Sequence, residues 1–202
     1  MTLYDIKPRF QALLRPLVGK LAAVGVTANQ VTIAAALGSI LLAAVLIVYD
    51  KMYQLFLLLP VWMFVRMALN AIDGMLAREF DQQSKLGAFL NELCDVISDA
   101  ALYLPFALIA PFSVAMVALV IFLATLSEFT GVLGQAVTGS RRYDGPLGKS
   151  DRAFIFGALG LWYGLSGVLP IWLYWLMPLL AVLLALTVFN RIRRALVEAK
   201  TV

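Results

Sequence analysis

Long apolar runs recur along the whole chain, and they constrain its fold more than any other feature. Runs of about 20 residues can cross a hydrocarbon layer of ~30 Å as helices. Hydrophobic residues make up 62% of the sequence and charged residues 14%, whereas soluble domains have about 45–50% and about 25%. Because backbone groups in lipid must bond within their own segment, the runs predict an all-α integral membrane protein.

The apolar runs predict six transmembrane helices, which cover Val31–Tyr49, Tyr53–Ala77, Leu86–Ala110, Phe112–Val137, Ala153–Leu169 and Ile171–Phe189. Ahead of them, Ile6–Val24 mixes Lys7, Arg9, Arg15 and Lys20 with apolar residues, which predicts an amphipathic helix in the membrane interface. We expect one domain over residues 1–202, with the interfacial helix in 1–26 and the six-helix bundle in 27–195. Polar side chains that typically cap helices precede the first and third spans, at Thr27 and Ser84.

The 16 lysines and arginines are distributed unevenly. Lys51 follows the first predicted span and Arg66 lies within the second. All the others fall before the first span or after the second, fourth or sixth span, which is one side of the membrane. The positive-inside rule therefore predicts that both termini are cytoplasmic. Because topology accounts for the basic residues, we expect no nucleic-acid partner.

The sequence contains no histidine and a single cysteine, Cys94. It therefore excludes an internal disulfide, a cysteine metal cluster, histidine zinc sites and a Ser-His-Asp triad. Acid–base or metal chemistry must use carboxylates and amides.

Polar residues interrupt the second, third and fourth predicted spans, where they are costly and are functional-site candidates. Spacings of three and four residues place two sets on one helix face each: Arg66, Asn70, Asp73 and Ala77 in the second span, and Gly87, Asn91, Asp95 and Asp99 in the third. In the fourth span Glu128 has no partner at helical spacing. A protonated buried carboxyl and a cavity-lining residue are both compatible with it.

The second and third spans run in opposite directions, so their polar faces are expected to meet. Asp73 should lie near Asn91 at the inner surface, with Asn70 and Asp95 deeper. Deepest of all, we expect Arg66 and Asp99 to form a structural ion pair. Oxygen ligands without nitrogen or sulfur suit Mg²⁺ or Mn²⁺. The glycines at 74 and 87 indicate either close helix packing or a nucleotide lying against the backbone.

The polar residues of these two spans also form a longer pattern. Its members are Asn70, Asp73, Gly74, Ala77, Arg78, Gly87, Asn91 and Asp95. Their spacing resembles the signature D-x2-D-G-x2-A-R-x8-G-x3-D-x3-D of the CDP-alcohol phosphatidyltransferases. The resemblance extends over most of the chain and includes a Thr-x-Asn sequence at the first span and a Gly-Lys pair before the fifth. The strings RMALNAIDGMLAR and GKSDR are most similar to an enterobacterial inner-membrane branch of that family.

This resemblance implies an enzyme of phospholipid biosynthesis in the bacterial inner membrane. Members transfer a phosphatidyl or similar group from a CDP-activated lipid to an alcohol or alcohol phosphate, and they release CMP. By position, the resemblance makes Asp73 and Asp95 catalytic metal ligands, with Asp95 also the general base. The remaining predicted metal ligands are Asn70 and Asn91, and the residues predicted to line the cytidine diphosphate pocket are Gly74, Ala77, Arg78 and Gly87. Mg²⁺ or Mn²⁺ is the implied cofactor, membrane lipid a partner, and a homodimer the implied assembly.

The chain departs from the signature where Asn70 and Asn91 replace its first and third Asp. Each asparagine keeps an oxygen ligand but removes a charge. Two interpretations follow: a working site with fewer or weaker metals, or a degenerate site that binds a nucleotide or lipid without turnover. A small transporter is a further alternative. The resemblance also implies that basic residues around the fifth span bind an acceptor phosphate, here Lys149, Arg152, Arg141 and Arg142. Membrane topology alone is an equal explanation for these residues.

Overall fold

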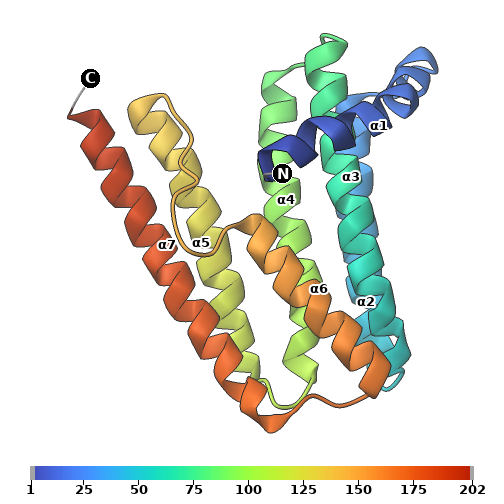
Figure 1. Ribbon diagram of the computed structural model, residues 1–202, viewed down its shortest axis with the longest axis vertical. Helices are drawn as coiled ribbons and strands as arrows, with labels where there is room; N and C mark the ends of the chain where they lie inside the picture. Colours follow the sequence, from blue (N-terminus) through green and yellow to red (C-terminus); the bar gives the residue numbers. More distant parts are fainter. Residues whose placement is uncertain (1–2, 201–202) are drawn as a thin grey trace. The chain divides into compact units, whose positions relative to one another are not determined.

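Helices make up the regular structure of residues 3–200, the part of the chain that the computed structural model describes (Figure 1). Side chains are described from residue 10 onward, so those of Lys7 and Arg9 in the predicted interfacial helix lie outside the described residues. In chain order the elements are α1 (Leu3–Ala23), α2 (Ala28–Val48), the 3₁₀ helix η1 (Tyr53–Leu57), α3 (Leu58–Glu79), α4 (Lys85–Tyr103), η2 (Leu104–Leu108), α5 (Val114–Thr138), α6 (Lys149–Ser166), η3 (Ile171–Trp175) and α7 (Leu176–Ala199). The all-α prediction is confirmed for these residues.

Of the helices, α6 and α7 extend furthest beyond the spans predicted from the sequence. The fifth span is predicted from Ala153, whereas α6 begins at Lys149, because the Asp151 carboxylate accepts a hydrogen bond from the Gly148 amide (2.8 Å) and caps the helix. The sixth predicted span ends at Phe189, whereas α7 continues to Ala199. Hydropathy marks where a chain becomes polar, and a helix can continue past that point.

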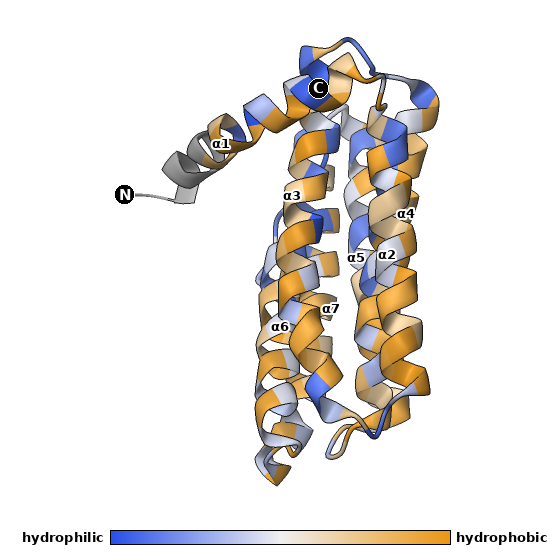
Figure 2. Ribbon diagram, turned by 90° about the vertical axis from the view of Figure 1, so that its right-hand side faces the viewer, coloured by the Kyte–Doolittle hydropathy of each residue, from blue (hydrophilic) through white to orange (hydrophobic). Residues whose placement is uncertain are grey.

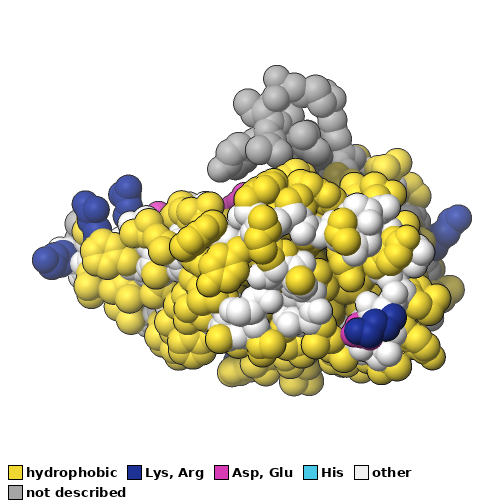
Figure 3. All heavy atoms as spheres, turned by 90° about the horizontal axis from the view of Figure 1, so that it is seen from below, with side chains coloured by type: hydrophobic (Ala, Val, Ile, Leu, Met, Phe, Trp, Pro, Cys, Tyr) yellow, Lys and Arg dark blue, Asp and Glu magenta, His cyan; other side chains and the backbone are white. Residues whose placement is uncertain are grey.

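Four helical segments of the described chain are long and apolar enough to cross a membrane: Ala28–Val48, Tyr53–Glu79, Val114–Thr138 and Ile171–Ala199. Hydrophobic residues cover most of the length of α2 and α3 in Figure 2 and most of the face in Figure 3. Charged residues such as Asp95 and Asp99 in α4, and Arg152 in α6, make those two helices less apolar. The count of six spans and the interfacial position of α1 stay predictions.

The chain divides into two compact units. The first unit consists of the chain up to Leu41 together with Val61–Ser98, and the second consists of Leu42–Pro60 and the chain from Asp99 onward. The α3–α4 connection lies in the first unit, and the α5–α6 connection lies in the second.

In the first unit, α1 packs against the start of α2 and the end of α3. A buried apolar cluster joins them through Val18 of α1, Val31 of α2 and Met75 of α3. At the surface, the guanidinium of Arg15 donates two hydrogen bonds to the Glu79 carboxylate, at 3.2 and 3.0 Å. This packing holds the beginning of one predicted span beside the end of the next.

In the second unit, aromatic rings form much of the core. Tyr103 of α4 stacks on Phe156 of α6, with ring centroids 3.9 Å apart. Phe56 of η1 meets Phe106 and Tyr163 edge-on. These contacts fasten α6 against η1, η2 and the end of α4.

The α5–α6 connection turns back along α5 before α6 begins (Figure 1). The Arg142 amide donates to the Gly131 carbonyl (3.3 Å), and the Leu147 amide donates to the Thr187 hydroxyl of α7 (3.1 Å). Between them, Gly145 has a φ of 132°, and a Cβ there would overlap Thr187. The connection is therefore packed against α5 and α7, and it determines where α6 starts.

Candidate active site

Two helix N-termini in the first unit begin with hydrogen-bonded caps. The Gln30 amide donates to the Thr27 hydroxyl (3.2 Å), and the Gln30 side chain accepts from the Thr27 amide (2.9 Å), which is a capping box. The Gly87 amide donates to the Ser84 hydroxyl (2.9 Å) at the start of α4. Both predicted caps, Thr27 and Ser84, are confirmed, and they begin the two helices that bound the site described next.

A pocket of about 360 Å³ lies in the first unit where α2 and α4 begin and α3 ends. Small-molecule sites typically measure about 300–1,000 Å³. Residues that the sequence pattern singled out line it at Asp73, Gly74, Ala77, Arg78, Gly87 and Asn91. The other lining residues are Ala28, Asn29, Thr32, Gln82, Gln83, Ser84 and Ala88. The structure thus brings together most of the motif, and adds polar side chains that the spacing of the motif does not identify.

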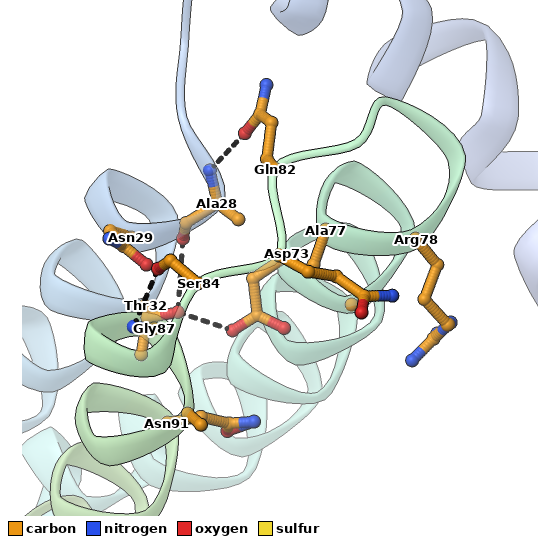
Figure 4. Close-up of a pocket in the computed structure, with 13 residues that line it drawn as sticks. Ala28, Asn29, Thr32, Asp73, Ala77, Arg78, Gln82, Ser84, Gly87 and Asn91 are labelled. Carbon is orange, nitrogen blue, oxygen red and sulfur yellow. Dashed lines mark hydrogen bonds between the residues drawn. The ribbon is translucent and has the colours of Figure 1, made fainter.

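Asp73 is buried in this pocket, with 5% of its surface exposed. The Thr32 hydroxyl, one turn into α2, donates to its carboxylate at 2.8 Å, and Figure 4 shows the two groups facing each other. Asn91 of α4 lines the same pocket, as the helix-face prediction expected of Asp73 and Asn91. Thr32 carries no sequence signal, because a hydroxyl in an apolar helix commonly bonds only to its own backbone.

The two glycines of the motif leave room for polar side chains. A Cβ at Gly74 would lie 3.0 Å from the Arg78 guanidinium, which folds back over that position. A Cβ at Gly87 would lie 2.8 Å from the Asn29 side-chain oxygen. Close packing thus explains both glycines, and it keeps Arg78 and Asn29 at the pocket wall.

The Gln82 side chain connects the α3–α4 loop to the start of α2. Its oxygen accepts a hydrogen bond from the Ala28 amide at 2.7 Å (Figure 4). This amide is one of the unsatisfied donors at a helix N-terminus. The bond fixes the loop across one side of the pocket.

Asp95 and Asn70 do not line this pocket, but they bond to each other. The Asn70 amide group donates to Asp95 Oδ1 at 3.1 Å, and the Arg66 guanidinium donates to the same oxygen at 3.1 Å. Arg66 is buried and also donates to the Asp95 carbonyl (3.0 Å). An ionised aspartate at position 70 could not donate such a bond, so the asparagine changes how Asp95 is held. The predicted ion pair of Arg66 with Asp99 concerns residues of different units and stays a prediction.

The residues predicted to bind an acceptor phosphate separate into three environments in the second unit. Arg141 and Arg152 both form ion pairs with Glu128, at 3.2 and 3.0 Å. Arg142 lies in the α5–α6 connection, and Lys149 is the first residue of α6. Sequence spacing identified no partner for Glu128, because these contacts come from outside its own helix.

Arg142, in the connection between α5 and α6, is held by two acidic neighbours. It donates to Asp144 at 3.0 Å and also pairs with Glu198 of α7. The hydrogen bond to Asp144 raises the pKa of Arg142 above its ordinary value. Burial acts to raise the pKa of Asp144, but the hydrogen bond and charge of Arg142 outweigh it and leave that pKa below its ordinary value.

The helical fold and the motif-lined pocket define a class of membrane protein. The sequence pattern of the CDP-alcohol phosphatidyltransferases matches residues 25–189. The chain therefore belongs to the CDP-alcohol phosphatidyltransferase family. It is 50% identical over 199 residues to the inner membrane protein YnbA of Escherichia coli K12, with 97% of each chain covered. It is 34% identical over 106 residues to the archaetidylinositol phosphate synthase of Pyrococcus horikoshii, which is 52% of this chain and 54% of that one.

Solved structures share the fold. The phosphatidylinositol phosphate synthase PgsA1 of Mycobacterium tuberculosis with CDP-DAG bound has a TM-score of 0.74 and 23% identity, with 89% of this chain and 92% of that chain covered. The same enzyme in complex with manganese and citrate has a TM-score of 0.71 and 22% identity, with 89% of this chain and 87% of that chain covered.

Proposed function

We propose that the protein transfers a phosphatidyl or similar phosphate-linked group from a CDP-activated lipid to an alcohol or alcohol phosphate, with release of CMP. The observation that carries the proposal is the pocket of the first unit. It gathers Asp73, Gly74, Ala77 and Arg78 from the end of α3 with Gly87 and Asn91 from the start of α4. The Arg78 guanidinium and the amide side chains of Asn29 and Asn91 can bond to a nucleoside diphosphate, and the Asp73 carboxylate can hold a divalent cation beside it. The relative that was solved with CDP-DAG supports this choice of donor.

The proposed reaction is a substitution at phosphorus. The acceptor oxygen forms a bond to the lipid-linked phosphorus, and the bond from that phosphorus to the CMP oxygen breaks. Asp95 takes the hydroxyl proton, and CMP leaves with the electron pair of the broken bond. Arg66 and Asn70 orient the Asp95 carboxylate through one of its oxygens. Arg78 faces the nucleotide phosphates from the pocket wall.

The donor atoms of the first unit suit a hard divalent cation. Mg²⁺ is typically held by one or two carboxylates together with substrate phosphates. Asp73 and Asp95 would provide the carboxylates and Asn70 and Asn91 amide oxygens. Substrate phosphate oxygens and water would complete the coordination, as is usual for Mg²⁺. When bound, the cation would neutralise the diphosphate and stabilise the leaving CMP. The mycobacterial relative in complex with manganese supports Mn²⁺ as well as Mg²⁺.

Further parts of the proposal concern the acceptor and the setting. Lys149, Arg152, Arg141 and Arg142 are the proposed contacts of an acceptor phosphate. The similarity to an inner membrane protein of E. coli supports an inner-membrane location. Both termini and the site would lie on the cytoplasmic side. The homodimer stays a prediction. Lys149→Ala is then expected to raise the acceptor KM and leave donor affinity unchanged. Equal effects on both substrates would contradict that role.

CMP release by the purified protein tests the function. The assay contains CDP-diacylglycerol, Mg²⁺ or Mn²⁺ and a panel of alcohols and alcohol phosphates, with Asp95→Asn as the matched variant. Metal-dependent release with one acceptor, lost in the variant, is the expected result. Donor binding without turnover for any acceptor favours a binding protein that has lost catalysis. In that case, activity restored by Asn70→Asp with Asn91→Asp would identify the two asparagines as the cause.

A further inference from the structure

Glu128 of α5 lies among three arginines in the second unit. Its Oε1 is 3.0 Å from Nη2 of Arg152 in α6. Its Oε2 is 3.2 Å from Nη2 of Arg141 in the α5–α6 connection and 3.6 Å from Nη1 of Arg191 in α7. One carboxylate thus bridges three guanidinium groups that come from three different elements.

This cluster is almost closed to solvent. The side chains of Arg152 and Arg191 are 1% and 2% exposed, and that of Glu128 is 10% exposed. Asp99 is the second carboxylate, 3.2 Å from Arg152. The Arg141 side chain, at 22% exposed, is the most open of the five.

Two of the guanidinium groups are held by contacts that do not involve Glu128. Arg152 donates to Asp99 at 3.2 Å. Arg191 donates to the backbone carbonyl of Ser127. These two arginines would therefore keep their positions if the Glu128 side chain turned away.

We infer that Glu128 occupies the position of the acceptor's phosphate and is displaced when a phosphorylated alcohol binds. Arginine forks bind carboxylate and phosphate oxygens with similar geometry, and a phosphate offers a third oxygen and more charge. In the absence of substrate the Glu128 carboxylate pairs with the guanidinium groups. It competes with phosphate for them and so lowers the affinity of the site for phosphate. Arg191 joins Arg141 and Arg152 as a phosphate contact. The inference rests on the proposed function for its acceptor, and it assigns that acceptor to the phosphorylated alcohols.

Inorganic phosphate is the probe that tests this role without any donor. Its dissociation constant is measured by equilibrium dialysis with radiolabelled phosphate on the full-length protein in lipid nanodiscs. Glu128→Gln keeps the shape of the side chain and removes its charge, so phosphate is expected to bind about tenfold more tightly than to the wild type. Glu79→Gln is the matched control, since Glu79 pairs with Arg15 in the other unit, and it should change the constant less than about twofold.

Equal or weaker phosphate binding by Glu128→Gln would overturn the inference, because the carboxylate would then serve the arginines only as a structural partner. An equal gain in Glu79→Gln would also overturn it, as a general effect of charge. If Glu128→Gln does not fold, Glu128→Asp decides the question. Its shorter carboxylate competes less well, so tighter phosphate binding than in the wild type is expected, and unchanged binding contradicts the inference.

The inference and the proposed function can fail separately. Tighter phosphate binding in Glu128→Gln, with no CMP release from any acceptor, would support the role of Glu128 and reject the transferase. CMP release with phosphate-free alcohols only, together with unchanged phosphate binding in Glu128→Gln, would support the transferase and reject the role of Glu128.

Discussion

Replacing Thr32 by valine removes one hydroxyl from the pocket and leaves the shape of the side chain nearly unchanged. That hydroxyl donates to Asp73 Oδ2 over 2.8 Å, and Thr32 and Asp73 are 7% and 5% exposed. A hydrogen bond to a charged group contributes about 1.5–3 kcal/mol, and about 1.4 kcal/mol corresponds to a factor of ten. If the bond orients Asp73 in the transition state, kcat/KM for Thr32→Val falls about 10- to 100-fold.

The assay is CMP release at donor concentrations below KM. Thr32→Ser keeps the hydroxyl and should stay within about threefold of the wild type. Thr130→Val is the matched control, because the Thr130 hydroxyl is also buried but donates only to the Leu126 carbonyl of its own helix (2.7 Å). Wild-type kcat/KM in Thr32→Val would refute the reasoning, since Asp73 would then be oriented without Thr32.

Three further predictions concern stability. Arg152→Met removes the guanidinium that Asp99 and Glu128 share and should lower the unfolding free energy in bicelles by about 3–5 kcal/mol. Arg15→Met, at the exposed pair with Glu79, should lower it by about 0–1 kcal/mol. Equal losses in the two variants would contradict the argument from burial. Gly38→Ala places a methyl group inside a packed indole ring and should lower Tm, while Gly19→Ala, with open space around it, should raise unfolding free energy by about 0.5–1 kcal/mol. The pKa of Asp144 is lowered in the folded protein, so its ion pair stabilises the fold above the unfolded carboxyl pKa of about 3.9 and is lost as pH falls through the lower folded pKa. Hydrogen exchange of residues 139–148, corrected for intrinsic rates, should therefore be equal at about pH 7.5 and 5.5. Faster corrected exchange at pH 5.5 would contradict this expectation.

The sequence predicted much of the first unit because its site is built on helix periodicity. Residues spaced by three and four share a face, and two antiparallel helices bring two such faces together. Asn70 and Asp95 accordingly form a hydrogen bond, and Asp73 and Asn91 line one pocket. The caps at Thr27 and Ser84 could be predicted for a similar reason, since they depend on residues three positions apart.

The polar contacts of the second unit could not be predicted in this way. Glu128 meets arginines from the α5–α6 connection, α6 and α7, and helical spacing relates only positions within one helix. The start of α6 at Lys149 was also missed, because its charged first turn resembles a loop in hydropathy. The contact of Thr32 with Asp73 could not be predicted either. The sequence of an apolar helix does not show whether an isolated hydroxyl lies beside a carboxylate of another helix.

The sequence alone determined the helical fold with its long apolar segments, the family and the motif residues that line the pocket of the first unit. Backbone bonding in lipid, the length of the apolar runs and helical spacing all act over short stretches of chain, so they can be read from it directly. Only the tertiary structure decided which side chains hold the carboxylates: Thr32 for Asp73, Asn70 and Arg66 for Asp95, and an arginine cluster for Glu128. Those partners depend on how distant segments pack and on which rotamers the packing allows, and the linear sequence does not contain that information in a local form.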